Sequence, residues 1–224
     1  LLKWYDKNAR DLPWRVPPIE SQRGIKPNPY HIWLSEVMLQ QTTVKVVKKY
    51  YEYFLLRWPT ITDLASANKD DIMEAWAGLG YYNRARNLMK CARIIKKTYG
   101  GKFPKDKNSL LNLPGVGDYT AAAMQSIGFN LKANVIDGNV ERIISRLFAI
   151  NTPIISSKKL IKSFAENINT TERFGDYAQA LMELGSEVCT PREPRCDYCP
   201  VKQFCKSNEL GLSDKIPFAA KKRK

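Results

Sequence analysis

Apolar side chains recur every three or four positions through most of this chain, which is the spacing of amphipathic α-helices. The pattern is clearest in seven segments, at residues 45–57, 70–77, 83–99, 119–128, 139–150, 158–168 and 175–188. No alternation of apolar and polar residues persists, as a half-buried strand would require. The pattern therefore predicts an all-α protein with short connections, in which the proline-rich residues 15–29 form a loop.

The composition is that of a folded protein with an anionic partner. The 224 residues are 44% hydrophobic, and 36 lysines and arginines outnumber 22 acidic residues, which leaves a net charge of +14. Such a surplus most often indicates binding to nucleic acid. The chain opens without a signal-peptide pattern, and its longest uncharged stretch is too short and too polar to cross a bilayer. We therefore expect neither secretion nor a membrane partner.

Part of the positive charge is arranged along one predicted helix. Arg86, Lys90, Arg93 and Lys97 step by four, three and four residues and share one face. The opposite face carries Leu88, Cys91, Ala92 and Ile95, so Cys91 is expected to be a small core residue. The basic face is either a solvated surface or a nucleic-acid contact. A second basic group, at residues 221–224, belongs to a predicted basic tail at 208–224.

Four cysteines gather within seventeen residues, in a segment predicted to be irregular. Cys189, Cys196, Cys199 and Cys205 have the spacing C-x6-C-x2-C-x5-C. Disulfides, zinc and an iron–sulfur cluster could each order such a loop. A reducing compartment disfavours disulfides, and zinc sites usually present two short-spaced pairs. The spacing thus favours a cluster and leaves zinc as the alternative. Arg192 and Arg195 would then lie on a rigid loop, facing phosphate.

A glycine-rich turn separates two predicted helices, at 107–111 and 119–128. Gly115 and Gly117, on either side of Val116, let the backbone turn tightly and approach a ligand closely. The start of the following helix suits a phosphate, because its backbone N–H groups are unpaired. A glycine turn alone is weak evidence. With LP before it and TAAA after, it has the pattern of a helix-hairpin-helix, which binds the DNA backbone without reading sequence.

Glu36 is the only formal charge between Lys26 and Lys45, within the apolar segment HIWLSEVMLQQ at residues 31–41. Apolar neighbours on nearly every side predict that its carboxyl group is desolvated. Such a carboxyl group can hold a proton near neutral pH and act as a general acid or base. The alternative is a buried glutamate paired with an arginine for structure. His31, the only histidine, is expected to be a packing residue.

A second carboxylate, Asp137, precedes the predicted helix at 139–150. Asp137 alone reads as a routine N-cap, but a carboxylate at a helix start can also stay ionised and aim its oxygens at a fixed point. One protonated and one ionised carboxyl group are what the cleavage of a glycosidic bond requires.

Together these segments resemble the helix-hairpin-helix DNA glycosylases of base excision repair, the endonuclease III superfamily, and within it the MutY-type adenine glycosylases. The resemblance covers residues 2–205. It rests on LPWR (12–15), SEVMLQQT (35–42), GLGYYNRARNL (78–88), LPGVGDYTA (113–121), IDGNVER (136–142) and the four-cysteine spacing, which matches the family's 4Fe–4S loop.

The resemblance implies catalytic roles. Glu36 matches the acid that protonates the flipped adenine at N7 and later handles the water. Asp137 matches the carboxylate that stabilises or captures the oxocarbenium-like sugar, and Asn139 matches a neighbour that positions this chemistry. Tyr119 stands where bifunctional relatives carry a Schiff-base lysine, which implies simple hydrolysis without strand nicking.

It also implies a DNA-binding surface. Gln41 and Tyr81 match residues that wedge into the base stack, and Leu39 lies in the same motif. The expected partner is double-stranded DNA in which adenine is mispaired with 8-oxoguanine or guanine, bound by a monomer. The expected location is the bacterial cytoplasm and nucleoid, or the nucleus or mitochondrion of a eukaryote.

The family's architecture implies two helical domains with the active site in the cleft between them. A six-helix domain with the helix-hairpin-helix would span 21–133, and a 4Fe–4S domain would combine 1–20 with 134–207. Two departures stand out. The loop at 15–29 is long, and the sequence stops about twenty residues past Cys205, before the C-terminal domain that usually recognises 8-oxoguanine. Either these residues are the catalytic part of a longer protein, or the preference for the opposite base is weakened.

Three alternatives remain. The chain could be a thymine glycosylase acting on G:T mispairs, which can also have tyrosine at the position of Tyr119, although Glu36 argues against it. It could be an endonuclease III-like glycosylase of the same fold. It could also be a non-catalytic DNA-binding iron–sulfur protein, which would bind DNA without releasing a base.

Overall fold

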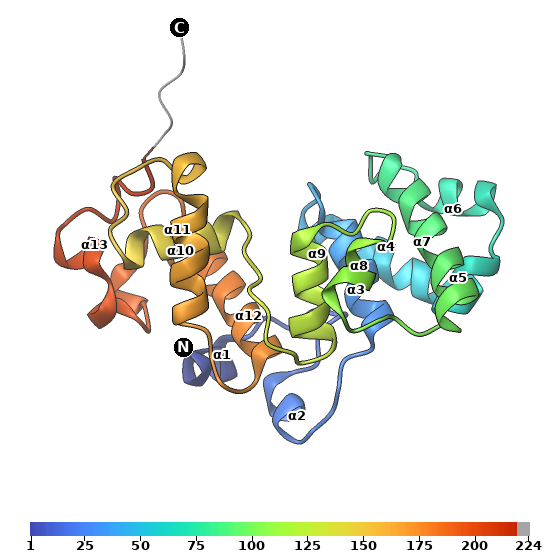
Figure 1. Cartoon of the computed structure of the whole chain (residues 1–224), viewed down its shortest axis with the longest axis horizontal. Coiled ribbons are helices and arrows are strands. Elements are labelled where there is room, and N and C mark those ends of the chain that lie inside the picture. The colour runs from blue at the N-terminus through green and yellow to red at the C-terminus, as the bar shows by residue number, and fades with distance from the viewer. Residues whose placement is uncertain (219–224) are drawn as a thin grey trace, which may run out of the picture. The chain divides into compact units, whose positions relative to one another are not determined.

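A computed structural model describes residues 1–218, and within that range the chain is helical and contains no strand (Figure 1). The predicted all-α class is therefore confirmed. The chain divides into a central unit, Asp11–Leu131, and a terminal unit that joins Leu1–Arg10 to the residues from Lys132 onward. The basic run at 221–224 lies outside the described residues.

The central unit is built around one apolar helix. Its helices are α2 (Pro18–Gln22), α3 (Pro29–Leu39), α4 (Val44–Arg57), α5 (Ile61–Ser66), α6 (Lys69–Ala75), α7 (Asn83–Tyr99), α8 (Lys107–Leu111) and α9 (Asp118–Ala123). Helix α3 packs against α4, α7 and α9, so little of its surface is left for water. Trp33, Leu34 and Met38 of α3 are fully buried, which explains why this segment shows no polar face.

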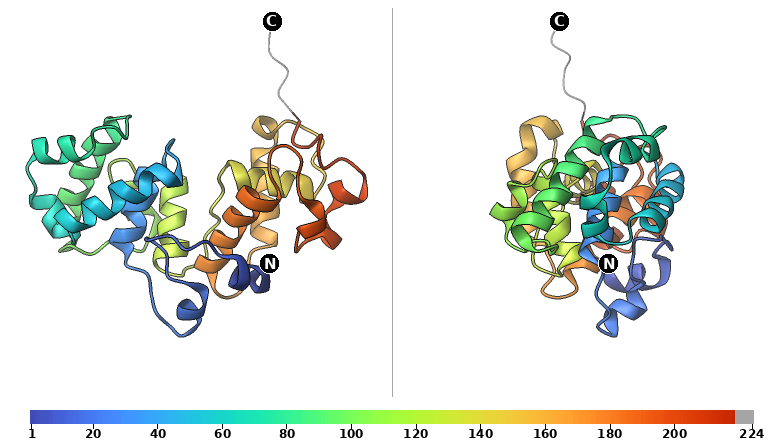
Figure 2. Two further views of the ribbon diagram at one scale, coloured as in Figure 1. Left: turned by 180° about the vertical axis from the view of Figure 1, so that it is seen from behind. Right: turned by 90° about the vertical axis from the view of Figure 1, so that its right-hand side faces the viewer.

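The terminal unit has its own core. Its helices are α1 (Leu2–Asn8), α10 (Gly138–Leu147), α11 (Ile154–Asn167), α12 (Phe174–Glu183) and α13 (Lys206–Glu209). Ile143 and Ile144 of α10, Ile161 of α11 and Leu184 after α12 form the centre of this core. Helix α13 packs on α10, and the red C-terminal segment that contains it lies beside the orange and yellow helices of this unit (Figures 1 and 2). Helix α10 is thus central to the unit.

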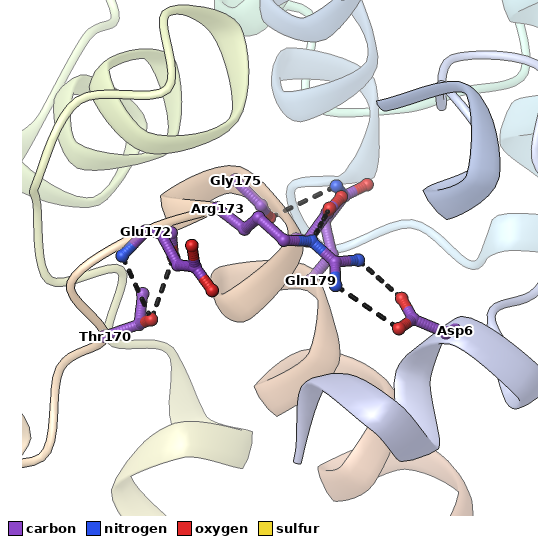
Figure 3. Close-up of polar contacts among 7 residues, drawn as sticks. Asp6, Thr170, Glu172, Arg173, Gly175 and Gln179 are labelled. Atoms are coloured by element: carbon purple, nitrogen blue, oxygen red, sulfur yellow. Dashed lines mark hydrogen bonds and ion pairs between the residues drawn. The ribbon is translucent and has the colours of Figure 1, made fainter. Parts of the chain in front are cut away.

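Two ion pairs attach the N-terminal segment to α12, and Figure 3 shows the one between Arg173 and Asp6. Arg173, at the start of α12, donates hydrogen bonds to both carboxylate oxygens of Asp6 in α1 and to Asp176 in α12. Hydrogen bonding to Asp6 raises the pKa of Arg173. The Arg10 Nε atom lies 2.6 Å from a carboxylate oxygen of Glu183, whose side chain is fully buried. These pairs explain why the first ten residues belong to the terminal unit.

Several elements differ from the sequence expectation. The predicted loop at 15–29 contains α2, and the pattern missed the short helices α1, α5 and α13. The predicted helices at 119–128 and 175–188 end in π-helical turns, at Met124–Gly128 and Leu184–Val188. The cysteine segment contains two short 3-10 turns, Cys196–Tyr198 and Lys202–Phe204. None of the described helices is both long enough and apolar enough to span a membrane.

Candidate functional site

Glu36 is a buried carboxylic acid in the middle of α3. Eight of the eleven residues of this helix are buried, and Glu36 itself is 8% exposed. The helix starts at Pro29, and Asn28 caps it by accepting a hydrogen bond from the backbone N–H of Tyr30 at 2.9 Å. The predicted burial of Glu36 is confirmed. A carboxyl group in such surroundings is suited to exchange a proton with a ligand.

Asp137 is the N-cap of α10. One carboxylate oxygen accepts a hydrogen bond from the backbone N–H of Val140 at 2.8 Å, as expected for a cap. The other oxygen accepts one from the side-chain amide of Asn139 at 3.0 Å. Both oxygens are therefore fixed in direction, while the residue remains partly exposed. The structure brings Asp137 and Asn139 into direct contact.

Asn139 continues this network toward the cysteine loop through Arg142. Arg142 Nη2 donates to the amide oxygen of Asn139 at 2.9 Å, and Arg142 Nε donates to the backbone carbonyl of Cys189 at 2.8 Å. Arg142 also donates to the carbonyl of Gly185, and its burial lowers its pKa. Neither Arg142 nor Gly185 stands out from the sequence pattern, in which the arginine of the motif IDGNVER is the only hint.

The cysteine loop is organised by a second buried arginine. Arg146 is 2% exposed and donates hydrogen bonds to the backbone carbonyls of Thr190 and Pro191 and to the thiol sulfur of Cys189. The thiols of Cys189, Cys196, Cys199 and Cys205 are free and partly buried. Burial raises the pKa of Cys199, and the other three thiols raise it further.

Among the described residues, no group of three or more His, Cys, Asp and Glu side chains could hold a single metal ion. Arg192 and Arg195 of the same loop are exposed, as are Tyr198 and Phe204. The loop therefore presents two arginines and two aromatic rings to solvent.

The glycine turn between α8 and α9 is shaped by close packing. Gly115 has a φ of 78°, and a Cβ atom there would lie 2.9 Å from Cβ of Asn87 in α7. Gly117 caps α9, while the Val116 side chain is buried, so Val116 can offer only its backbone to a ligand. Lys107 and Asp118 form an ion pair of 2.9 Å between the two helices. Tyr119, the second residue of α9, is partly exposed.

The basic face of α7 is confirmed. Arg86, Lys90, Arg93 and Lys97 are all exposed, and the four residues assigned to the opposite face are fully or almost fully buried. Cys91 is accordingly a core residue, and burial raises its pKa to about 12.

Gln41 and Tyr81 both sit in turns with a left-handed backbone. Their φ angles are 57° and 47°, values that residues other than glycine rarely adopt. The Tyr81 side chain is 60% exposed, Gln41 is also exposed, and Leu39 at the end of α3 is partly buried. The two turns thus present polar and aromatic side chains to solvent.

Comparison with known proteins places these features in one family. Residues 34–170, more than half of the chain, match the family model described as HhH-GPD superfamily base excision DNA repair protein. An adenine DNA glycosylase of Rattus norvegicus is 43% identical over 93% of this chain, which spans 41% of the length of the rat protein.

Two solved structures have a similar fold. A thermostable thymine-DNA glycosylase has a TM-score of 0.78 and 31% identity, and 93% of each chain is covered. An endonuclease III in a non-covalent complex with DNA has a TM-score of 0.68 and 25% identity, over 84% of this chain and 87% of its own. The chain belongs to the HhH-GPD superfamily of base excision DNA repair proteins.

Proposed function

We propose that this chain is a monofunctional adenine DNA glycosylase that removes adenine mispaired with 8-oxoguanine or guanine. The observation that carries the proposal is the carboxyl group of Glu36, 8% exposed in the middle of an apolar helix. Support for adenine comes from the 43% identity to a protein named as an adenine DNA glycosylase. The substrate is double-stranded DNA, bound by a monomer.

The proposed reaction breaks the bond between N9 of adenine and C1′ of deoxyribose. Glu36 protonates adenine at N7, so the base leaves as a neutral molecule. Asp137, whose oxygens are fixed by Val140 and Asn139, stabilises the positive charge that develops on the sugar. Water then adds its oxygen to C1′ and gives up a proton, which restores Glu36. Tyr119 lacks the amine that a Schiff base needs, so no strand nicking is expected.

The DNA surface combines sequence-independent contacts with a wedge. The basic face of α7, the loop arginines and the backbone of the glycine turn bind phosphates; their residues are Arg86, Lys90, Arg93, Lys97, Arg192, Arg195, Gly115 and Gly117. Gln41 and Tyr81, with Leu39 beside them, enter the base stack where the adenine leaves it. Extrusion of a base costs a few kcal/mol and is cheapest at a mispair, which favours a mispaired adenine.

The four cysteines are proposed to hold a 4Fe–4S cluster. The four thiols are free and partly buried, which suits the thiolate ligands of a cluster. Only Cys196 and Cys199 form a short-spaced pair, whereas zinc sites usually present two such pairs, so the spacing favours a cluster over zinc. When bound, the cluster fixes the loop that carries Arg192 and Arg195. Iron and acid-labile sulfide in the purified protein test this assignment, and stoichiometric zinc would contradict it.

The test of function is base release from defined duplexes under single-turnover conditions. Duplexes with A:8-oxoguanine, A:G and G:T are incubated with excess protein and then cleaved with alkali at abasic sites. Adenine release without nicking before alkali is expected. Glu36→Gln is expected to slow release by about 10²–10⁴-fold while mispair binding persists. Glu52→Gln, which neutralises an exposed carboxylate on α4, is the matched control.

One specific observation favours a second candidate. The thermostable thymine-DNA glycosylase matches this chain over 93% of both lengths. Thymine release from G:T without adenine release would establish that alternative, and binding without any release would indicate a non-catalytic DNA-binding protein.

A further inference from the structure

Arg84 is a buried arginine whose guanidinium group joins two turns that lie far apart in the sequence. Its side chain leaves α7 on the side opposite the basic face and is 8% exposed. Nη1 donates to the carbonyls of Val37 and Met38, at the end of α3, at 3.1 and 2.7 Å. Nη2 donates to the side chain of Thr42 at 3.0 Å and to the carbonyl of Leu79 at 2.9 Å.

These acceptors lie next to Gln41 and Tyr81 in the sequence, the two exposed residues proposed to enter the base stack. Met38 and Thr42 lie on either side of Gln41 in the sequence, and Leu79 and Gly80 come directly before Tyr81. The Gly80 carbonyl accepts hydrogen bonds from Arg84 Nη2 at 3.4 Å and from Trp76 Nε1 at 3.0 Å. The Arg84 guanidinium also lies over the Tyr81 ring, with Cζ 5.5 Å from its centroid.

Both turns need such support, because their backbone conformations are rarely populated. Gln41 and Tyr81 have positive φ angles. Residues in such conformations persist only where several contacts with the surrounding structure hold them in place. The Tyr81 turn also has a contact of its own, because the Tyr50 hydroxyl donates to the Ala77 carbonyl. This hydroxyl lies so close to Gly78 that a Cβ atom there would be 2.3 Å away from it. Of the contacts named here, only those of Arg84 reach both turns.

We propose that Arg84 is a positioning residue that holds Gln41 and Tyr81 as one rigid pair, so that both side chains enter the base stack together. The inference rests on the proposed function for the roles of Gln41 and Tyr81. This role requires the guanidinium group, whose two Nη atoms donate in different directions. A lysine ammonium is a point donor and cannot bridge acceptors on two segments in this geometry.

The first experiment is independent of catalysis. Backbone hydrogen exchange is measured on the full chain without DNA for the wild type, Arg84→Lys and Tyr50→Phe. Arg84→Lys is expected to speed exchange in residues 40–42 and 79–82 together. Tyr50→Phe, which removes only the hydroxyl that donates to the Ala77 carbonyl, is expected to speed it only in 79–82. Exchange that rises in one turn alone, or uniformly over the central unit, would overturn the proposal.

The second experiment is a double-mutant cycle on function. Arg84→Lys is expected to slow single-turnover adenine release by about 10²-fold, which is the scale of loss when a reacting group is misplaced by about 1 Å. In a Gln41→Ala/Tyr81→Ala background, Arg84→Lys is expected to have no further effect. An equal loss in both backgrounds would indicate general structural support instead and would overturn the positioning role. If the wild type releases no adenine, the proposed function is contradicted. The hydrogen-exchange experiment then tests the positioning role of Arg84 by itself.

Discussion

Asn139 and Gly185 touch so closely that no side chain fits at position 185. A Cβ atom built on Gly185 would lie 2.5 Å from Cβ of Asn139 and 3.1 Å from its Cγ. The contact places the Asn139 amide between Asp137 and Arg142, which in turn donates to the Gly185 carbonyl. The π-helical turn that contains Gly185 thereby sets the position of the residue that holds Asp137.

Gly185→Ala is expected to displace Asn139 and to lower both stability and base release. Overpacking of this kind costs about 1–3 kcal/mol of unfolding free energy. Urea unfolding and single-turnover release measure the two effects. Gly138→Ala is the control, because nothing lies within 4 Å of a Cβ atom there. Equal behaviour of the two variants would contradict the assigned role of Gly185.

Asp137 combines a cap with a charge, and two substitutions separate these roles. Asparagine is a good N-cap, so Asp137→Asn is expected to retain the stability of α10 while base release is lost. Asp137→Ala is expected to lose release and, in addition, about 1 kcal/mol of stability. Thermal unfolding and release assays distinguish them. Full activity in Asp137→Asn would rule out a role for the negative charge.

The basic face of α7 predicts the salt dependence of duplex binding. Each phosphate contact removed is expected to reduce the slope of log Kobs against log salt by about 0.9, whatever the DNA sequence. Lys90→Ala and Arg93→Ala are compared with Lys96→Ala on the same helix. Lys96 donates to the Ser66 hydroxyl at 2.6 Å, so its substitution should leave the slope unchanged. Equal slopes in all three variants would place the DNA elsewhere.

His31 predicts a loss of stability in mild acid. Burial lowers its pKa below the ordinary value of 6.5, and its ring lies edge-on to those of Tyr30 and Tyr51. The unfolded chain therefore takes up the proton more readily, so stability is lost as the pH falls through 6.5 toward the folded-state pKa. Urea unfolding at pH 7.5 and 5.5 measures this loss. Since His31 is the only histidine, His31→Phe is expected to flatten the dependence.

Local patterns could be predicted from the sequence because their physical causes are local. The buried Glu36, the exposed basic face of α7 and the Asp137 cap each follow from residues within one or two helical turns. The π-helical turns were missed because they change the helical period too little to alter the apolar pattern.

The arginines inside the structure were missed for a different reason. Arg84 reaches acceptors 46 and 47 positions away, and Arg142 reaches Cys189 at a separation of 47. The helical spacing does put Arg84 on the apolar face of α7, but no neighbouring residue shows which acceptors these arginines reach. Their roles appear only when the fold brings distant backbone carbonyls together, as it also does for Gly185.

The attachment of α1 to α12 determines the order in which the chain can fold during synthesis. Residues 11–131 are contiguous, so the central unit is complete as soon as Leu131 has left the ribosome. Asp6 and Arg10 are made before the central unit, but their partners Arg173 and Glu183 emerge more than 160 residues later. Helix α1 is therefore made before the central unit but reaches its final place only after that unit is complete.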